Sequence, residues 1–165
     1  MKFISTTAIA LAAMLQVANA NFDVYNQGIG GNGISGNTWG WQVYTSDPSC
    51  DDVHAWIWRD SSDVSGGKYG VRCKGDGCAA ENDADPSDIN EIEFNFNSDD
   101  FHFTAYKNRD WGLYDLDDNK IGTCMPFPDN NFYCGKGLGQ ANGIRKLRCL
   151  TNSITAEDIN AHKPS

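Results

Sequence analysis

Hydrophobic and polar residues alternate with a period of two over residues 89–107, on both sides of a short polar stretch. In the first run Ile92, Phe94 and Phe96 share one face, while polar residues occupy the other. In the second run Phe103 and its apolar neighbours alternate with polar residues in the same way, and Asn, Ser and Asp fill the turn between the runs. Strands that are buried on one face and solvated on the other show this alternation. The pattern predicts a β-hairpin.

Shorter runs of the same kind recur along the chain, separated by glycine-rich or polar stretches. They predict further strands near residues 22–25, 39–45, 68–73, 111–116, 121–124 and 144–150. The glycine-rich stretch 28–37 is predicted to be a long turn, because glycine readily takes positive φ. Short strands with turn signals between them indicate a mainly β fold, either a single antiparallel β-sandwich or a partly open β-barrel with one or two short helices.

Residues 51–59 fit two patterns. Val53, Trp56 and Ile57 have the i, i+3, i+4 spacing of a helix, and acidic residues follow a serine where a first helical turn would begin. The same segment also alternates as a strand would. We predict a short helix here.

The first twenty residues have the features of a secretory signal peptide. Lys2 gives a positive start, residues 8–15 are apolar but too short to span a bilayer, and residues 18–20 have the small-x-small form that signal peptidase cuts after. The remainder has no stretch long and apolar enough to anchor the chain, so we expect a secreted, extracellular protein. The chain then divides into a signal peptide (1–20), a single disulfide-bonded β-rich domain (21–155) and a loose C-terminal tail (156–165).

The sequence contains an even number of cysteines, all of them after the predicted cleavage site: Cys50, Cys73, Cys78, Cys124, Cys134 and Cys149. In a secreted chain an even count indicates disulfides, here three. Many pairings are possible, and we predict Cys73–Cys78, Cys124–Cys134 and Cys50–Cys149. The disulfides are expected to add durability to a chain that is already long enough to bury a core.

The chain is acidic, with a formal net charge of −9 at pH 7. Such a surface repels phosphate backbones and anionic lipid headgroups, which argues against general nucleic-acid or membrane binding. The glycine-rich stretch 28–37 matches neither a Walker loop nor a dinucleotide turn. We therefore expect no cofactor.

Acidic residues gather in the segment that follows Cys78. Asp83, Asp85 and Asp88 carry oxygen ligands of the kind that calcium prefers, so they form a weak candidate calcium site. The alternative is a solvated acidic loop pinned by a small disulfide. The three histidines lack the spacing of a zinc site, so no metal is expected there.

Four tryptophans are candidates for sugar stacking: Trp39, Trp41, Trp58 and Trp111. Exposed rings two residues apart on a strand, such as Trp39 and Trp41, would form a platform for a carbohydrate ring. Large aromatic residues more often fill a core or pack across strands. A carbohydrate-binding module is therefore one alternative function, and it requires exposed rings.

A small secreted ribonuclease is a second alternative. Such an enzyme uses a His, a Glu and an Arg on a sheet for acid-base attack by the ribose hydroxyl on the phosphate. His102 lies on the strand that faces Glu91 and Glu93, and the last predicted strand supplies Arg145 and Arg148. A one-residue slip in register would separate these groups, so the sequence leaves their convergence open. The basic residues would otherwise form cross-strand pairs with the two glutamates.

Several segments, together with the leader, resemble small cysteine-rich secreted proteins of filamentous ascomycete fungi. The segments are residues 21–25, 40–44, 56–59, 66–73 and 148–150. Many proteins of this kind look like effectors or elicitors that act at the plant surface. The resemblance implies fungal secretion and a virulence-related or elicitor role, and it carries no catalytic motif. We therefore expect a monomeric, non-enzymatic interaction protein whose partner is a host extracellular protein or a cell-wall glycan.

Overall fold

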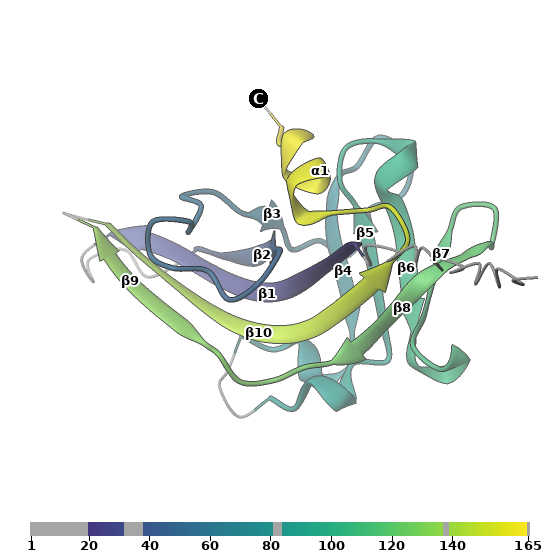
Figure 1. Cartoon of the computed structure of the whole chain (residues 1–165), viewed down its shortest axis with the longest axis horizontal. Coiled ribbons are helices and arrows are strands. Elements are labelled where there is room, and N and C mark those ends of the chain that lie inside the picture. The colour runs from purple at the N-terminus through teal and green to yellow at the C-terminus, as the bar shows by residue number, and fades with distance from the viewer. Residues whose placement is uncertain (1–19, 32–37, 81–83, 137–138, 165) are drawn as a thin grey trace, which may run out of the picture.

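The computed structural model describes residues 20–31, 38–80, 84–136 and 139–164 (Figure 1). The strands in these ranges are β1 (Ala20–Gly31), β2 (Thr38–Tyr44), β3 (Trp58–Arg59), β4 (Gly70–Lys74), β5 (Glu91–Asn95), β6 (His102–Tyr106), β7 (Gly112–Asp115), β8 (Lys120–Pro126), β9 (Phe132–Lys136) and β10 (Gly139–Thr151). The helices are the short 3-10 turns η1 (Asp76–Cys78), η2 (Pro86–Asp88), η3 (Asp99–Phe101) and η4 (Lys107–Arg109), and α1 (Ala156–Ala161). The predicted signal peptide, apart from Ala20, lies outside the described residues. None of the helices described here has the length and apolar character needed to cross a bilayer.

The strands form one antiparallel sheet in the order β3-β2-β1-β10-β8-β7-β6-β5-β4, with β9 paired to β10. β1 and β10 are long and curved and run together through the molecule (Figure 1). At the two ends of the sheet, Asp60 forms a parallel bridge with Val71, and the Ser61 amide donates to the Val71 carbonyl at 2.9 Å. The sheet is therefore nearly closed into a barrel, which confirms the prediction of a mainly β, partly open barrel.

The alternating hairpin predicted at residues 89–107 forms as β5 and β6. Ile92, Phe94 and Phe96 are fully buried, and Phe94 pairs in register with the buried Phe103. These side chains pack against Phe22 from β1 in the barrel interior. Removing each such side chain from water contributes about 1.5–3 kcal/mol, so this aromatic cluster is a main source of stability.

The tryptophan pair at the start of the sheet belongs to the core. Trp41 of β2 pairs with Trp58 of β3, and each is only 1% exposed. The Trp41 indole nitrogen donates to the Asp60 carboxylate at 2.8 Å. Gly40 allows the close approach of these strands, because a Cβ at this position would lie 2.4 Å from the Trp58 carbonyl oxygen.

The predicted helix at residues 51–59 is wrong. This segment is irregular until it becomes β3 at Trp58. Its backbone groups are bound by side chains of β1 and β2: Gln27 donates to the His54 carbonyl at 2.8 Å, and Gln42 donates to the Trp56 carbonyl at 3.2 Å. Since these carbonyls are held by buried side chains, the segment satisfies its backbone without helical hydrogen bonds.

The glycine-rich stretch predicted as a turn at residues 28–37 begins as a strand. β1 pairs with both β2 and β10 as far as Ile29, and Gly30 and Gly31 continue the strand by pairing with β10. Residues 32–37 lie outside the described part of the chain. A glycine-containing segment can stay extended when a neighbouring strand satisfies its backbone hydrogen bonds.

The C-terminal segment, predicted to be a loose tail from residue 156, contains α1. Thr155 begins the helix with a capping box, in which its hydroxyl accepts from the Asp158 amide. Ala156 and Ile159 are buried and belong to the core cluster. The helix is therefore packed against the barrel through one short apolar face.

The six cysteines form three disulfides, and two of the predicted pairings are wrong. The bonds are Cys50–Cys134, Cys73–Cys78 and Cys124–Cys149. Cys124 and Cys149 stand directly opposite each other where β8 pairs with β10, which no sequence spacing could reveal. Cys73–Cys78, a bond across five residues, is the pairing that local spacing predicted correctly.

Candidate functional site

The structure brings together an imidazole, a carboxylate and a guanidinium on the outer face of β4, β5 and β6. Arg72 stands opposite Glu93 in the β4–β5 register. Its Nε donates to Glu93 Oε2 at 2.7 Å, and its Nη2 also reaches Glu91 Oε1 at 2.6 Å. His102 Nε2 lies 2.9 Å from Glu93 Oε1. Both oxygens of Glu93 are therefore engaged by neighbouring side chains.

This Arg72–Glu93–His102 cluster is an internal ion-pair network. Burial raises the pKa of Glu93, but the hydrogen bonds and charges of His102 and Arg72 outweigh burial and hold the pKa below its usual value. Burial lowers the pKa of Arg72, and its two carboxylate partners more than reverse this, so the net pKa is raised. Both shifts favour the ionised forms of Glu93 and Arg72.

A loop covers the histidine end of this cluster. Asn95, the register partner of His102, donates through Nδ2 to the carbonyls of Val64 and Gly66, both at 3.0 Å. Val64 is fully buried, and His102 is only 5% exposed. The imidazole is therefore almost fully covered by neighbouring parts of the chain.

Of the five residues predicted for a ribonuclease-like site, His102, Glu91 and Glu93 gather on this face. The cation that joins them is Arg72, which the sequence reasoning missed, while Arg145 and Arg148 lie on β10. β8, β7 and β6 separate β10 from β5 in the sheet. The prediction that the basic residues of the last strand pair with the two glutamates is therefore wrong. Arg72 lies in a strand that the sequence did predict, but the neighbour of that strand was unknown.

Arg145 and Arg148 instead bind Asp23, a carboxylate with no exposed surface. Arg148 donates to it from Nε at 2.6 Å and from Nη2 at 2.7 Å, and Arg145 donates from Nη1 at 3.1 Å. Both guanidinium groups also lie about 4 Å from the centre of the Phe127 ring, at 4.2 and 4.0 Å. This second network joins β1 to β10 and to the loop after β8.

The four tryptophans do not form a shared sugar platform. Trp41 and Trp58 are in the core, so their faces cannot stack on a carbohydrate. Trp39 and Trp111 are half-buried and belong to different parts of the sheet, because β1, β10 and β8 separate β2 from β7. The requirement of exposed rings is not met at Trp41 and Trp58.

Two of the three candidate calcium ligands, Asp85 and Asp88, lie at the two ends of η2. Asp85 caps η2 by accepting the Ser87 amide at 2.8 Å, and hydrogen bonds from Ser87 lower the pKa of its carboxyl. Asp88 ends η2 with an exposed side chain, and Asp83 lies outside the described residues. Across the described ranges, no three His, Cys, Asp or Glu side chains gather as a metal site.

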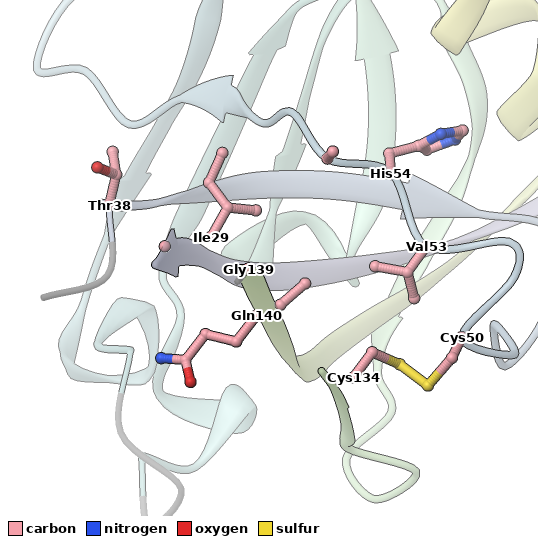
Figure 2. Close-up of a pocket in the computed structure, with 11 residues that line it drawn as sticks. Ile29, Thr38, Cys50, Val53, His54, Cys134, Gly139 and Gln140 are labelled. Atoms are coloured by element: carbon pink, nitrogen blue, oxygen red, sulfur yellow. A yellow bond between two sulfur atoms is a disulfide. The ribbon is translucent and has the colours of Figure 1, made fainter. Parts of the chain in front are cut away.

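A pocket that the sequence did not suggest lies between the β1–β2–β10 sheet and the segment 50–55 that crosses it (Figure 2). Its volume is about 380 Å³. The lining residues are Ile29, Gly30, Thr38, Cys50, Val53, His54, Ala55, Cys134, Gly139, Gln140 and Ala141. Ile29 and Val53 point into the space from opposite walls, and the Cys50–Cys134 disulfide closes one end (Figure 2).

Three polar side chains of β1 and β2 fix the crossing segment and the residue that follows it. Gln27 Nε2 holds the His54 carbonyl, Gln27 Oε1 accepts from the Tyr44 hydroxyl at 2.6 Å, and that hydroxyl accepts the His54 amide at 3.2 Å. Gln42 holds the Trp56 carbonyl. Burial raises the pKa of Tyr44 to about 12, so it stays a neutral donor at ordinary pH.

An acidic groove lies on the other side of the same segment. Val53 and His54 line both spaces, and the remaining wall of the groove comes from β2, α1 and the loop 45–52. Its carboxylates are Asp47, Asp51, Asp52 and Glu157. The His54 ring stacks on Tyr44, and burial, assisted by Lys163 and opposed by Asp52, lowers its pKa. His54 is therefore uncharged at neutral pH.

Comparison of this chain with protein-family models, with curated proteins and with solved structures finds no match.

Proposed function

We propose that this chain is a secreted, non-enzymatic binding protein of the effector or elicitor type, which acts in the extracellular space at a host surface. The predicted leader, the acidic charge and the resemblance to ascomycete cysteine-rich proteins motivate the location and the role. The three disulfides support a protein built to persist in an oxidising environment.

The observation that carries the proposal is that His102 and Glu93 are occupied by contacts within the protein. A general base or acid must reach a substrate proton within hydrogen-bond distance. Here Glu93 is engaged by Arg72 and by His102, and His102 is covered by the segment at Val64. The groups that would form a ribonuclease centre instead stabilise the sheet and the loop above it.

The surface beside the Cys50–Cys134 disulfide supports a contact role. Tyr133 on β9 is 69% exposed, and tyrosine is among the residues that contribute most binding energy at protein interfaces. β9 pairs with β10 and lies off the main strand order, so it is an edge of the sheet. We propose that this surface, together with the acidic loop 45–52, contacts a host extracellular protein.

The test applies the purified chain from Asn21 onward to leaf tissue, to an RNA substrate and to a glycan array in parallel. The expected result is a necrotic or defence response that survives heating, with no RNA cleavage and no glycan binding. Protein that has been reduced and alkylated should lose the response, because the disulfides hold its surface loops in place.

A matched variant separates the binding and enzymatic interpretations. Folded His102→Gln protein should keep the tissue response. If the native protein cleaves RNA and His102→Gln does not, the chain is an enzyme and the proposal fails. Binding to the glycan array that is lost in Trp39→Ala or Trp111→Ala would establish the carbohydrate-binding alternative instead.

A further inference from the structure

The pocket beside the Cys50–Cys134 disulfide has the character of a small-molecule site (Figure 2). We propose that it binds an uncharged, largely apolar small molecule. The proposal deepens the binding role proposed above by naming a class of ligand. It rests on that role in one respect, namely that the chain binds the ligand without transforming it.

The first argument is the chemistry of the wall. Ile29, Val53, Ala55 and Ala141 provide aliphatic surface, and the disulfide adds polarisable sulfur at one end. Ligand sites are mostly apolar, with a few polar groups that fix orientation. Thr38 and Gln140 are uncharged polar residues of the described wall. Gln140 Oε1 accepts from the Tyr133 hydroxyl at 3.1 Å, and the Thr38 hydroxyl fits that second role.

The second argument is charge. Among the described residues that line the pocket there is no Asp, Glu, Lys or Arg, although the protein as a whole carries a formal charge of −9. His54 contributes to the wall, but its ring points away from the space that Ile29 and Val53 face (Figure 2). An anionic ligand would lose its hydration without gaining a cation, and the carboxylates of the adjacent groove would repel it. The pocket therefore selects against negative charge.

The third argument is that the pocket is already formed. The crossing segment is held by hydrogen bonds with Gln27, Gln42 and Tyr44 and by a covalent bond to Cys134 at its start. A site that does not have to be ordered on binding keeps more of its contact energy as affinity. These hydrogen bonds and the disulfide hold the wall of the pocket in place without a ligand.

The fourth argument is size. A volume of about 380 Å³ lies at the lower end of the range of about 300–1,000 Å³ that is typical of small-molecule sites. It suits a compact ring system or a short aliphatic chain. A folded protein partner would insert at most one side chain into a space of this size.

The test uses two dyes that share a ring system. N-phenylnaphthylamine is uncharged, and anilinonaphthalene sulfonate carries the same rings with a negative charge. The neutral dye should bind the folded protein saturably, with one dye per chain and a rise in fluorescence. The sulfonate should bind at least about tenfold more weakly, a difference of about 1.4 kcal/mol, because the pocket offers no cation.

Three variants test whether the dye binds in this pocket. Ala55 is an exposed residue of the rim. Ala55→Trp should obstruct the pocket and lower the affinity for the neutral dye by about tenfold or more. Thr38→Trp, also at an exposed lining position, tests the obstruction without relying on Ala55. Ala161→Trp makes the same change as Ala55→Trp at an exposed position on α1 that does not line the pocket, and it should leave affinity unchanged. Circular dichroism checks that each variant is folded.

Four outcomes would overturn the proposal. They are no saturable binding of the neutral dye, equal binding of the sulfonate, binding unchanged in both rim variants, and a dimer that binds the dye only when diluted to monomers. The last outcome would make a second copy of the chain the occupant. Because the dye experiment uses neither tissue nor RNA, its failure is distinct from failure of the host-surface role.

Discussion

At the scale of single residues, buried and half-buried charged side chains join the strands of this protein. Asp23 receives two arginines of β10, and Glu93 receives Arg72 and His102. Breaking a buried pair by removing one partner costs more than the pair contributes, because the other charge is left uncompensated. Replacement of the carboxylate in either cluster should therefore lower the free energy of unfolding more than replacement of an exposed carboxylate.

Replacement of Glu93 by Gln should lower the free energy of unfolding at neutral pH by about 1–3 kcal/mol, because Arg72 loses its closest anion. The folded pKa of Glu93 is depressed, so its contribution is present above the ordinary glutamate pKa of 4.5 and is lost as pH falls through the folded value. The difference between native and variant protein should therefore shrink in acid. Urea unfolding at a series of pH values measures it.

Asp100→Asn is the control for this experiment, since Asp100 is an exposed acidic residue in the turn of the same hairpin. It should change stability by less than about 0.5 kcal/mol. A Glu93→Gln variant with unchanged stability at neutral pH would show that the cluster contributes nothing to the fold.

At the scale of elements, the irregular segment 50–57 shows how side chains replace secondary structure. Two glutamines and a tyrosine of β1 and β2 bind its backbone, and the Cys50–Cys134 bond ties its start to β9. The segment thereby forms a wall of the apolar pocket on one side and of the acidic groove on the other. Its position depends on contacts with residues far away in sequence.

The disulfides should differ in their effect on stability. Cys50–Cys134 spans 84 residues, Cys124–Cys149 spans 25 and Cys73–Cys78 spans five. In the chain-entropy model these closures contribute about 4.5, 3.5 and 2 kcal/mol respectively. Replacement of each pair by alanines, followed by thermal unfolding, should give losses in that order. A larger loss for Cys73–Cys78 than for Cys50–Cys134 would contradict the expectation.

At the scale of the whole molecule, the barrel has one weak seam. β3 has two residues, and its connection to β4 consists of the Asp60–Val71 bridge and the hydrogen bond from Ser61. By contrast, β1 and β10 pair over their length. Local opening free energies are lowest where few hydrogen bonds and buried contacts hold an element.

Amide hydrogen exchange should show this asymmetry. The Ser61 amide should exchange at least about a hundredfold faster than amides in the centre of the β1–β10 pairing, because opening the seam leaves the core strands intact. Nuclear magnetic resonance of the folded protein in deuterated buffer measures both. Equal protection at the two places would mean that the barrel opens as one unit.

The alternation at residues 89–107 was sufficient to predict the hairpin and its buried face, because side chains alternate across any strand whatever lies beside it. The mainly β class and the participation of all six cysteines in disulfides followed in the same way from local pattern and composition. His102 and Glu93 were placed on facing strands from the turn between them.

Only the tertiary structure decided which strands are neighbours, and the remaining features depend on that choice. It placed Arg72 rather than Arg145 beside Glu93, set Cys149 opposite Cys124, buried Trp41 and held residues 51–57 out of a helix. The pocket arises from the same long-range pairing, since its walls come from β1, β2, β9, β10 and a crossing segment. Sequence periodicity reports which face of a strand is apolar, but strand order is set by the packing of the whole sheet.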